Sequence, residues 1–189
     1  MDAIKLLIAD HNRVKGLFAR YDEAQESSRT DDAALLASQI FEELEVHTTI
    51  EEEVFYPAAH GTSEELGKVV DEGIQEHHVV KVLMDEIGGL KPGSVNWVAK
   101  MAVIKESVEH HVEEEEGEMF PAVRSATNAT WRDDLGDQLE TKKAELGAPT
   151  LAEKASMTKE ALQELAKEQK IPGRSSMDHE ELAATVRPE

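Results

Sequence analysis

The chain of 189 residues is long enough for one sizeable core and an appendage. It has 40 acidic and 20 basic residues, a formal net charge of −20, which argues against nucleic acid as the main partner. The absence of cysteine excludes disulfides, thiolate metal sites and cysteine nucleophiles. The apolar run in MDAIKLLIAD is too short for a signal peptide, and no stretch approaches the roughly 18 apolar residues of a membrane span. We therefore expect a soluble, cytoplasmic protein with no membrane partner.

Two long amphipathic helices are expected first, because apolar residues recur at helical spacing along most of the chain. The inward stripe of the first helix comprises Ile4, Leu7, Ile8, Val14, Leu17, Phe18 and Tyr21. The polar segment ESSRTDD separates it from the second helix, for which Asp31 or Asp32 is the expected N-cap. The inward stripe of the second helix comprises Leu36, Ile40, Leu44, Val54 and Phe55.

Two further long helices are expected after the segment HGTSEE, in which Thr62 and Glu65 have the spacing of a capping box. The segment GGLKPGS separates them, and Ser94 can cap the second of the two. Four long helices joined by short polar loops predict an all-α fold, an antiparallel up-down four-helix bundle over residues 1–125. The two inward stripes comprise Val70, Ile74, Val80, Met84 and Ile87, and then Trp97, Met101, Ile104, Val108 and Met119.

An additional amphipathic helix and a small tail are expected after the bundle. The helix falls within residues 126–148 and ends at the segment GAPT. Residues 149–189 have two short helical patterns about a Pro-Gly turn, which predict a flexibly tethered helix-turn-helix element. The segment IPGRSSM resembles Rho N-terminal or SAP-type elements, but residues 150–189 hold six basic and eight acidic residues and so lack a positive surface for nucleic acid. The inward face of the additional helix comprises Trp131, Leu135, Leu139 and Leu146.

Histidine and glutamate residues interrupt the apolar stripes of all four bundle helices. The second and fourth helices each have an H-x-x-x-E pair, and residues four apart lie on the same helix face. A single inward histidine is more often a hydrogen-bonded core residue than a ligand. Two buried carboxylates, however, need compensation that a metal ion can supply, because burying an unpaired ion costs several kcal/mol or more. The six residues predicted to face the interior are His11, His47, Glu51, His77, His111 and Glu115.

An internal repeat strengthens the prediction of a metal site. DHNRVKGLF, which starts at Asp10, matches EHHVVKVLM, which starts at Glu76. EVHTTIEEEVFYP and EHHVEEEEGEMFP match in the same way, with a histidine ten residues and a glutamate six residues before the closing proline. The first two and the last two bundle helices are therefore expected to be copies of one helical hairpin. Two such hairpins packed face to face would build a site of near two-fold symmetry.

From about Asp2 to Val123 the sequence resembles a hemerythrin-like (HHE cation-binding) domain, through the combined pattern H…HxxxE…H…HxxxE with closing FYP and MFP. The resemblance implies a non-heme di-iron centre, with two iron ions held by the six residues named above. Glu51 and Glu115 would bridge the ions together with an oxo or hydroxo group. Imidazole and carboxylate ligands suit iron, while the spacing alone leaves manganese and zinc open.

The chain differs from oxygen-carrying hemerythrins at two positions. Lys81 stands where those proteins have a second third-helix histidine, and the last carboxylate follows its histidine by four residues instead of five. Each iron would then keep an open position, which favours reaction with peroxide, dioxygen or nitric oxide and therefore a catalase-like or peroxide-defence activity. The alternatives are a non-catalytic module that binds or senses iron, dioxygen or nitric oxide, an iron donor for cluster repair, and a metal-free bundle. The sequence defines no oligomeric state.

Several neighbours of the six residues have a simpler interpretation. His110 with Glu114 is an alternative i,i+4 register, but the apolar stripe and the count from the proline favour the register given above. Most other glutamates of these segments are expected on a solvated face, although Glu52 and Glu116 could help to orient the ligands. Two aromatic residues beside the closing prolines are expected in the core: Tyr56 and Phe120.

Overall fold

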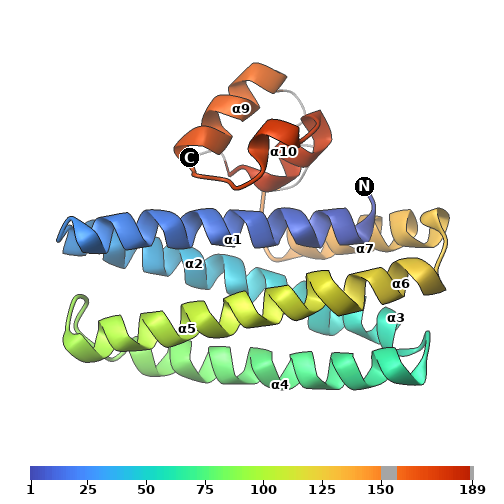
Figure 1. Ribbon diagram of the computed structural model, residues 1–189, viewed down its shortest axis with the longest axis horizontal. Coiled ribbons are helices and arrows are strands. Elements are labelled where there is room, and N and C mark those ends of the chain that lie inside the picture. The colour runs from blue at the N-terminus through green and yellow to red at the C-terminus, as the bar shows by residue number, and fades with distance from the viewer. Residues whose placement is uncertain (150–156, 188–189) are drawn as a thin grey trace.

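A computed structural model describes residues 1–149 and 157–187, and over these residues the chain is α-helical with no strand. Four long helices run alternately up and down, which confirms the predicted four-helix bundle (Figure 1). The four bundle helices are α1 (Ala3–Glu26), α2 (Thr30–Ile50), α4 (Glu64–Ile87) and α5 (Val95–Glu114).

Shorter segments continue two of these helices at one end of the bundle (Figure 1). The extension of α2 consists of η1 (Glu51–Phe55) and α3 (Tyr56–His60), and that of α5 consists of η2 (Glu115–Met119) and α6 (Phe120–Ala126). Beyond the bundle lie α7 (Ala129–Glu145), α9 (Lys159–Glu168), η3 (Arg174–Ser176) and α10 (His179–Thr185). In the part of the chain that the structure describes, no helix combines the length and apolarity needed to cross a membrane.

The bundle interior consists of two apolar clusters with a polar layer between them. One cluster includes Phe18, Ile40 and Met101, and the other includes Ile4 and Phe55. Along α1, the buried residues of the cluster around Ile4 end at position 7, and those of the cluster around Phe18 begin at position 14. The intervening turn contributes His11 to the polar layer, so water is kept away from this layer on both sides.

Each of the two extended helices widens into a single π-helical turn, which the sequence analysis did not predict. The amide of Tyr56 bonds to the carbonyl of Glu51, and the amide of Phe120 bonds to that of Glu115, five residues back in both cases. A proline follows each of these amides, and a proline ring excludes the normal bond to the carbonyl four residues back. Because π-turns are frequent at functional sites, their start at the two glutamates points to this layer.

The predicted N-cap of α2 is wrong. The helix begins at Thr30, and its N-cap residue Arg29 makes no capping hydrogen bond with its side chain. Asp31 and Asp32 lie inside the first turn instead, where the positive end of the helix dipole stabilises their negative charges. The guanidinium of Arg29 lies 2.7 Å from the carboxylate of Asp32, which ties the start of the helix together.

The capping box predicted for α4 is also wrong by one residue. Ser63 is the N-cap, and its hydroxyl accepts a bond of 3.2 Å from the amide of Leu66. Thr62 instead donates its hydroxyl hydrogen to the preceding helix, to a carbonyl at 2.7 Å. The cap predicted for α5 is confirmed, since Ser94 accepts a bond from the amide of Trp97.

Two residues assigned to inward stripes lie at the surface. Ile74 is 37% exposed, because the buried row of α4 passes through Gly73, where a side chain would meet the hydroxyl of Tyr56 at 2.9 Å. Leu146 is 40% exposed, because α7 ends one residue before it. The absence of a side chain at position 73 makes room for a tyrosine hydroxyl in the polar layer.

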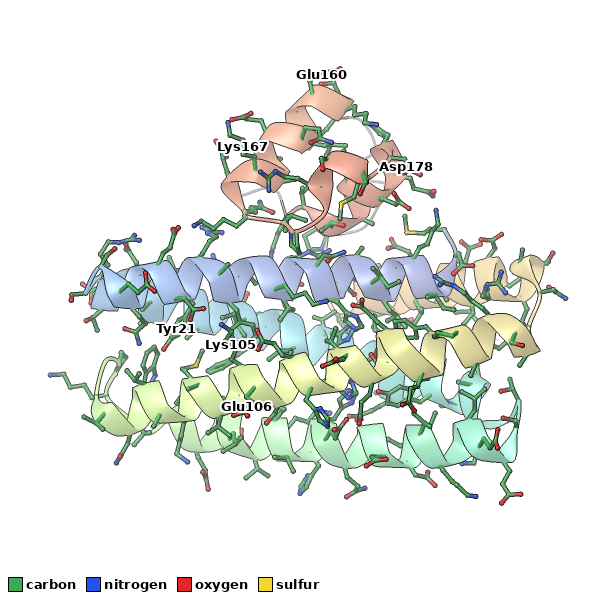
Figure 2. The ribbon with its side chains drawn as sticks, viewed as in Figure 1. Tyr21, Lys105, Glu106, Glu160, Lys167 and Asp178 are labelled. Atoms are coloured by element: carbon green, nitrogen blue, oxygen red, sulfur yellow. The ribbon has the colours of Figure 1, made fainter. Side chains whose placement is uncertain are left out.

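The tail forms a small body that packs on α1. It has its own apolar core around Leu162, Ile171 and Leu182, and α10 contacts α1 directly (Figure 1). In Figure 2, Glu160 lies at the end of the tail far from the bundle. The predicted pair of short helices about the Pro-Gly turn is present as α9 and α10, but the tail is docked instead of free. Part of the predicted tether, residues 150–156, lies outside the described residues.

Candidate metal centre

The structure brings together all six residues predicted as ligands. They lie in the polar layer of the bundle, and their exposed fractions run from 0% for Glu51 to 6% for His111. Their side-chain nitrogen and oxygen atoms fall into two groups, within each of which the atoms lie no more than 4.8 Å apart. One group is His11, His47, Glu51 and Glu115, and the other is Glu51, His77 and His111.

The histidines therefore pair within each hairpin. We call His11 and His47, from α1 and α2, the first half-site, and His77 and His111, from α4 and α5, the second half-site. The ring centroids are 4.9 Å apart in the first half-site and 4.7 Å in the second, and both ring pairs meet edge to face. The same arrangement in both hairpins is the two-fold symmetry that the sequence repeat predicted.

Each of the two glutamates lies between one histidine of each half-site. Oε2 of Glu51 is 3.2 Å from Nε2 of His47 and 3.4 Å from Nε2 of His77. Oε2 of Glu115 is 3.2 Å from Nε2 of His11 and 3.6 Å from Nε2 of His111. The carboxylates thus occupy the positions that groups bridging two cations would need.

Several polar atoms at this centre are buried without a hydrogen-bond partner among the described residues. They include both carboxylate oxygens of Glu51, Oε2 of Glu115 and Nε2 of both His11 and His47. An unsatisfied buried polar group costs about 1–3 kcal/mol, and more if it is charged. A cation would satisfy all of these atoms at once, and imidazole nitrogen with carboxylate oxygen suits iron, manganese or zinc. The residues present therefore fit a bound metal cation, and the unpartnered histidine nitrogens belong to the first half-site.

The residues that follow the two glutamates orient histidines across the hairpins. Glu52 Oε1 lies 3.0 Å from Nδ1 of His77, and Glu116 Oε1 lies 2.9 Å from Nδ1 of His11. A carboxylate on one ring nitrogen fixes the tautomer and leaves the other nitrogen free for a metal. Each hairpin thus supports a histidine of the other.

A second pair of acidic residues, not identified in the sequence analysis, lies behind the remaining histidines, and of the two Glu76 is within hydrogen-bond distance of its histidine. Glu76 Oε2 lies 2.7 Å from Nδ1 of His111, and Asp10 Oδ2 lies 3.7 Å from Nδ1 of His47. Both acids directly precede a candidate ligand, and they occupy the same position of the repeat. That alignment was the sequence signal that could have identified them.

Lys81 does not enter the centre. Its Nζ donates to Oε1 of Glu52 at 2.8 Å, and Lys15 makes the equivalent bond of 3.1 Å to Glu116. The two lysines also align in the repeat. Lys81 therefore does not distinguish the two half-sites, because its counterpart Lys15 makes the equivalent contact.

Tyr56 belongs to the centre and is more than the core residue that the sequence predicted. Its hydroxyl donates to Oε1 of Glu115 at 3.0 Å and lies 3.4 Å from Nε2 of both His77 and His111. Burial, followed by the negative charge of Glu51, raises the pKa of Tyr56, so the group stays a neutral phenol that can donate a proton. The equivalent residue near the first half-site is Phe120, whose ring stacks on His11 at 5.7 Å.

The two buried glutamates are so close that ionisation of one opposes ionisation of the other. Burial and the neighbouring Glu115 raise the pKa of Glu51 to about 7. Burial also opposes ionisation of Glu115, but the close approach of His11, with Nε2 at 3.2 Å, and the charge of His111 outweigh it and lower the pKa of Glu115 to about 2. Two carboxylates so close together favour a shared positive partner over two separate negative charges.

The space beside the centre is small. A cavity of about 20 Å³ is bordered by the four histidines and, on its apolar side, by Val14, Leu44 and Val80. A cavity needs roughly 10–15 Å³ to hold one water molecule. The cavity therefore has room for a molecule of one or two non-hydrogen atoms and is too small for larger substrates.

The alternative register remains outside the centre. His110 is exposed, and its Nε2 lies 3.4 Å from Glu114 and 3.9 Å from Glu76 at the bundle surface. His110 and Glu114 thus lie on the solvent side of α5, and of this cluster Glu76 is the member that reaches the buried layer, through His111.

Comparison with known proteins identifies the family. The family model described as the hemerythrin HHE cation binding domain matches residues 2–123, so the chain belongs to this family. Among curated proteins, the chain is similar to "DNA nickase" from Nostoc sp. (strain PCC 7120 / SAG 25.82 / UTEX 2576), with 25% identity over 142 residues. The match covers 72% of this chain but 38% of that relative, so the chain spans well under half of its length. No solved structure matches the chain significantly.

Proposed function

We propose that the protein is a non-heme di-iron protein that removes peroxide. The observation that carries this proposal is the pair of buried carboxylates, Glu51 and Glu115, which form no ion pair with a lysine or arginine among the described residues and lie between four histidine nitrogens. His11 and His47 would hold one iron, His77 and His111 the other, and the two glutamates would bridge them. Bound iron would supply the electrons and the open coordination positions that peroxide, dioxygen or nitric oxide require.

The chain's own residues have three tasks in this proposal. The surrounding carboxylates hold three of the four imidazoles, those of His11, His77 and His111, with Nε2 directed inward. The two apolar clusters keep bulk water away, and the cavity of about 20 Å³ restricts the reactant to the size of peroxide or a diatomic gas. Tyr56 places a neutral hydroxyl next to the second half-site, where it can donate a hydrogen bond or a proton to a small ligand.

The test has two measurements on the same preparation. Iron is counted per chain, and oxygen evolution is then followed after hydrogen peroxide is added. We expect about two irons and sustained oxygen release, with both lowered in Glu51→Ala and Glu115→Ala but not in the exposed control Glu113→Ala. Two irons without oxygen release would favour the alternatives, a module that binds or senses iron, dioxygen or nitric oxide, or an iron donor. Equal losses in all three variants would contradict the proposed ligands.

DNA cleavage is a second candidate function, because the similar Nostoc protein carries the name DNA nickase. Paired metal ions can promote displacement at a phosphodiester. Against this, a net charge of −20 repels the DNA backbone, and the cavity at the centre is too small for a nucleotide. Incubating supercoiled plasmid with the metal-loaded protein decides the matter. Nicking that is lost in Glu51→Ala would support this function, and intact plasmid would leave peroxide removal as the activity.

A further inference from the structure

The docked tail is held by a buried arginine of α1. Arg13 is 5% exposed, and its Nε donates to the carbonyl of Thr185 at 2.8 Å, while Nη2 donates to that of Ala184. These carbonyls lie at the C-terminal end of α10, where the negative end of the helix dipole also stabilises the positive charge of Arg13. On its other side, Arg13 bonds to Glu43 of α2 at 2.7 Å. The bundle and the tail are thus connected through one desolvated side chain.

A glycine of α1 permits the close contact between the two parts. A Cβ atom at Gly16 would lie 2.5 Å from the backbone oxygen of Gln169 and 3.1 Å from the side chain of Ile171. Glycine is disfavoured inside helices by about 0.5–1 kcal/mol relative to alanine, so its place here has a packing reason. The surface of α1 is shaped to receive the tail.

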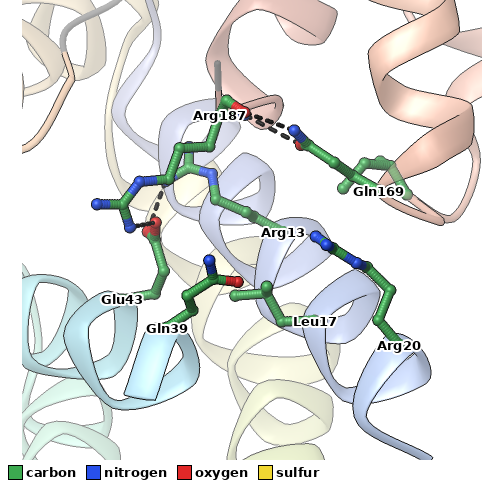
Figure 3. Close-up of a pocket in the computed structure, with 8 residues that line it drawn as sticks. Arg13, Leu17, Arg20, Gln39, Glu43, Gln169 and Arg187 are labelled. Carbon is green, nitrogen blue, oxygen red and sulfur yellow. Dashed lines mark hydrogen bonds and ion pairs between the residues drawn. The ribbon is translucent and has the colours of Figure 1, made fainter. Parts of the chain in front are cut away.

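A cavity of about 90 Å³ remains between α1, α2 and the docked tail (Figure 3). Since one water molecule needs roughly 10–15 Å³, the cavity has room for a ligand of several atoms. Leu17 and Ile171 line it with apolar surface. The polar residues that line it are Arg13, Arg20, Gln39, Glu43, Gln169 and Arg187.

Of the three arginines that line the cavity, Arg20 is the one without a carboxylate partner among the described residues. Glu43 accepts bonds from Arg13 at 2.7 Å and from Arg187 at 2.6 Å, so its own charge is neutralised. These two arginines also face a second carboxylate each, at 3.2 Å and 3.6 Å, outside the cavity. Arg20 has no hydrogen bond or ion pair with any described residue. In a chain with twice as many acids as bases, an unpaired arginine at a cavity is unexpected.

We propose that this cavity binds a small oxyanion, a carboxylate or a phosphate group. The planar guanidinium of Arg20 presents two parallel donors that match two oxygens of one acid group. The amide of Gln39, which also lacks a partner within the described ranges, lines the same cavity from α2 and offers a third donor (Figure 3). The ligand stabilises the docked tail, because Gln169 and Ile171 of the tail form one wall of its site. The site lies outside the metal centre, and Arg13 links the two through its ion pair with Asp10.

Calorimetric titration of the full chain tests the site, with inorganic phosphate and acetate as separate ligands at constant ionic strength. We expect one of them to bind at a single site, and Arg20→Gln to weaken that binding about tenfold or more. Arg29→Gln is the matched control, because Arg29 is an equally charged residue of the loop between α1 and α2, far from the cavity. Binding of neither ligand, or equal binding by Arg20→Gln and the wild type, overturns the proposal.

A second variant tests the contribution of the tail without removing any lining side chain. Gly16→Ala should improve the helix propensity of α1, yet its new methyl group should push Gln169 and Ile171 away. We expect this variant to keep the wild-type helix content by circular dichroism but to bind the oxyanion at least tenfold more weakly. Undiminished binding would show that the tail forms no part of the site and would overturn that half of the proposal.

Discussion

The two half-sites have the same histidine frame, but different residues support them. Behind the first half-site, Asp10 is almost fully buried and is held by Lys143 of α7 at 2.6 Å and by Arg13 at 3.2 Å. Behind the second, Glu76 has a side chain that is 23% exposed and faces His110 at the surface. The duplicated hairpins provide the symmetric part, and the elements that exist once, α7 and the tail, add only to the first half-site.

The aromatic residues beside the two half-sites also differ, and here the second half-site has the additional polar group. The second half-site has the hydroxyl of Tyr56 within 3.4 Å of both histidine nitrogens, while the first has the apolar ring of Phe120. A rigid, dry half-site is suited to holding a metal, and a half-site with a proton donor is suited to reacting with a ligand. We therefore expect the first half-site to bind metal more tightly and the second to carry the chemistry.

Metal removal tests what the two half-sites have in common and should have the largest effect. If a metal binds only the folded state, it stabilises that state, by about 2.7 kcal/mol at a concentration one hundred times the Kd. Chelation should therefore lower the melting temperature, and added ferrous iron should restore it. The measurement is thermal unfolding by circular dichroism before and after chelation. A chelated protein that melts with the untreated one would show that no metal stabilises the buried layer.

Substitution of the two supporting acids tests the difference between the half-sites. Burial would raise the pKa of Asp10, but the charges of Lys143 and Arg13 hold this pKa well below its usual range. Asp10→Asn leaves Lys143 buried without its partner, at a cost of about 3–5 kcal/mol, whereas Glu76→Gln disturbs a partly exposed group. We expect either change to weaken metal binding about 10–100-fold, with a loss of stability only for Asp10→Asn.

Metal titrations and thermal unfolding of the two variants provide the comparison. Since each substitution removes one carboxylate behind one histidine, the pair is closely matched. Equal losses of stability in both variants would mean that α7 and Arg13 give the first half-site no additional support, and the proposed asymmetry would be wrong.

The exchange of Tyr56 and Phe120 tests which half-site reacts. Tyr56→Phe removes the proton donor and should slow peroxide turnover by about 100-fold or more if the hydroxyl acts as a general acid. Its effect on metal content should be small, because the hydroxyl only donates to Glu115. Phe120→Tyr places a hydroxyl near the first half-site and serves as the matched control. Unchanged turnover in Tyr56→Phe would exclude the tyrosine from the reaction.

Acid should weaken the docking of the tail on α1. We expect this effect to be the smallest, because the tail supports the first half-site and not the second. Burial opposes ionisation of Glu43, but Arg13 outweighs it and the pKa of Glu43 is lowered. A group with a lowered pKa stabilises the folded state above its ordinary pKa, and this contribution is lost as the pH falls through the lowered value. We therefore expect faster hydrogen exchange in α9 and α10 below about pH 4.

Glu43→Gln is the control for the acid effect. It should expose α9 and α10 to exchange already at neutral pH, because Arg13 and Arg187 lose their shared carboxylate. Exchange in these helices that is independent of pH in the wild type and unaffected by the substitution would show that Glu43 does not hold the tail.

The candidate ligands could be predicted from the sequence because they follow local rules. The i,i+4 spacing put His47 beside Glu51 and His111 beside Glu115, and the apolar stripes showed which face was buried. The repeat then related the two hairpins. These signals depend on residues close together in one helix, so no knowledge of tertiary contacts was needed.

Other features depend on contacts that are distant in sequence. Arg13 bonds to a carbonyl 172 residues away, and Lys143 bonds to Asp10 across 133 residues. A lysine or arginine is most often exposed, so neither would be placed in a buried network from periodicity. The hydroxyl of Tyr56 was missed because an aromatic residue on an apolar stripe is expected in the core. The space for it depends on Gly73, which lies on another helix.

The most direct test of the di-metal centre is the iron content per chain of a double variant, Glu51→Gln with Glu115→Gln. These substitutions keep the shapes of the side chains and remove both candidate bridges. After loading with ferrous iron and desalting, we predict about two irons per chain for the wild type and for Glu113→Gln, and fewer than one for the double variant. An unchanged iron content in the folded double variant would contradict the assignment of these glutamates as the residues that hold the metal ions together.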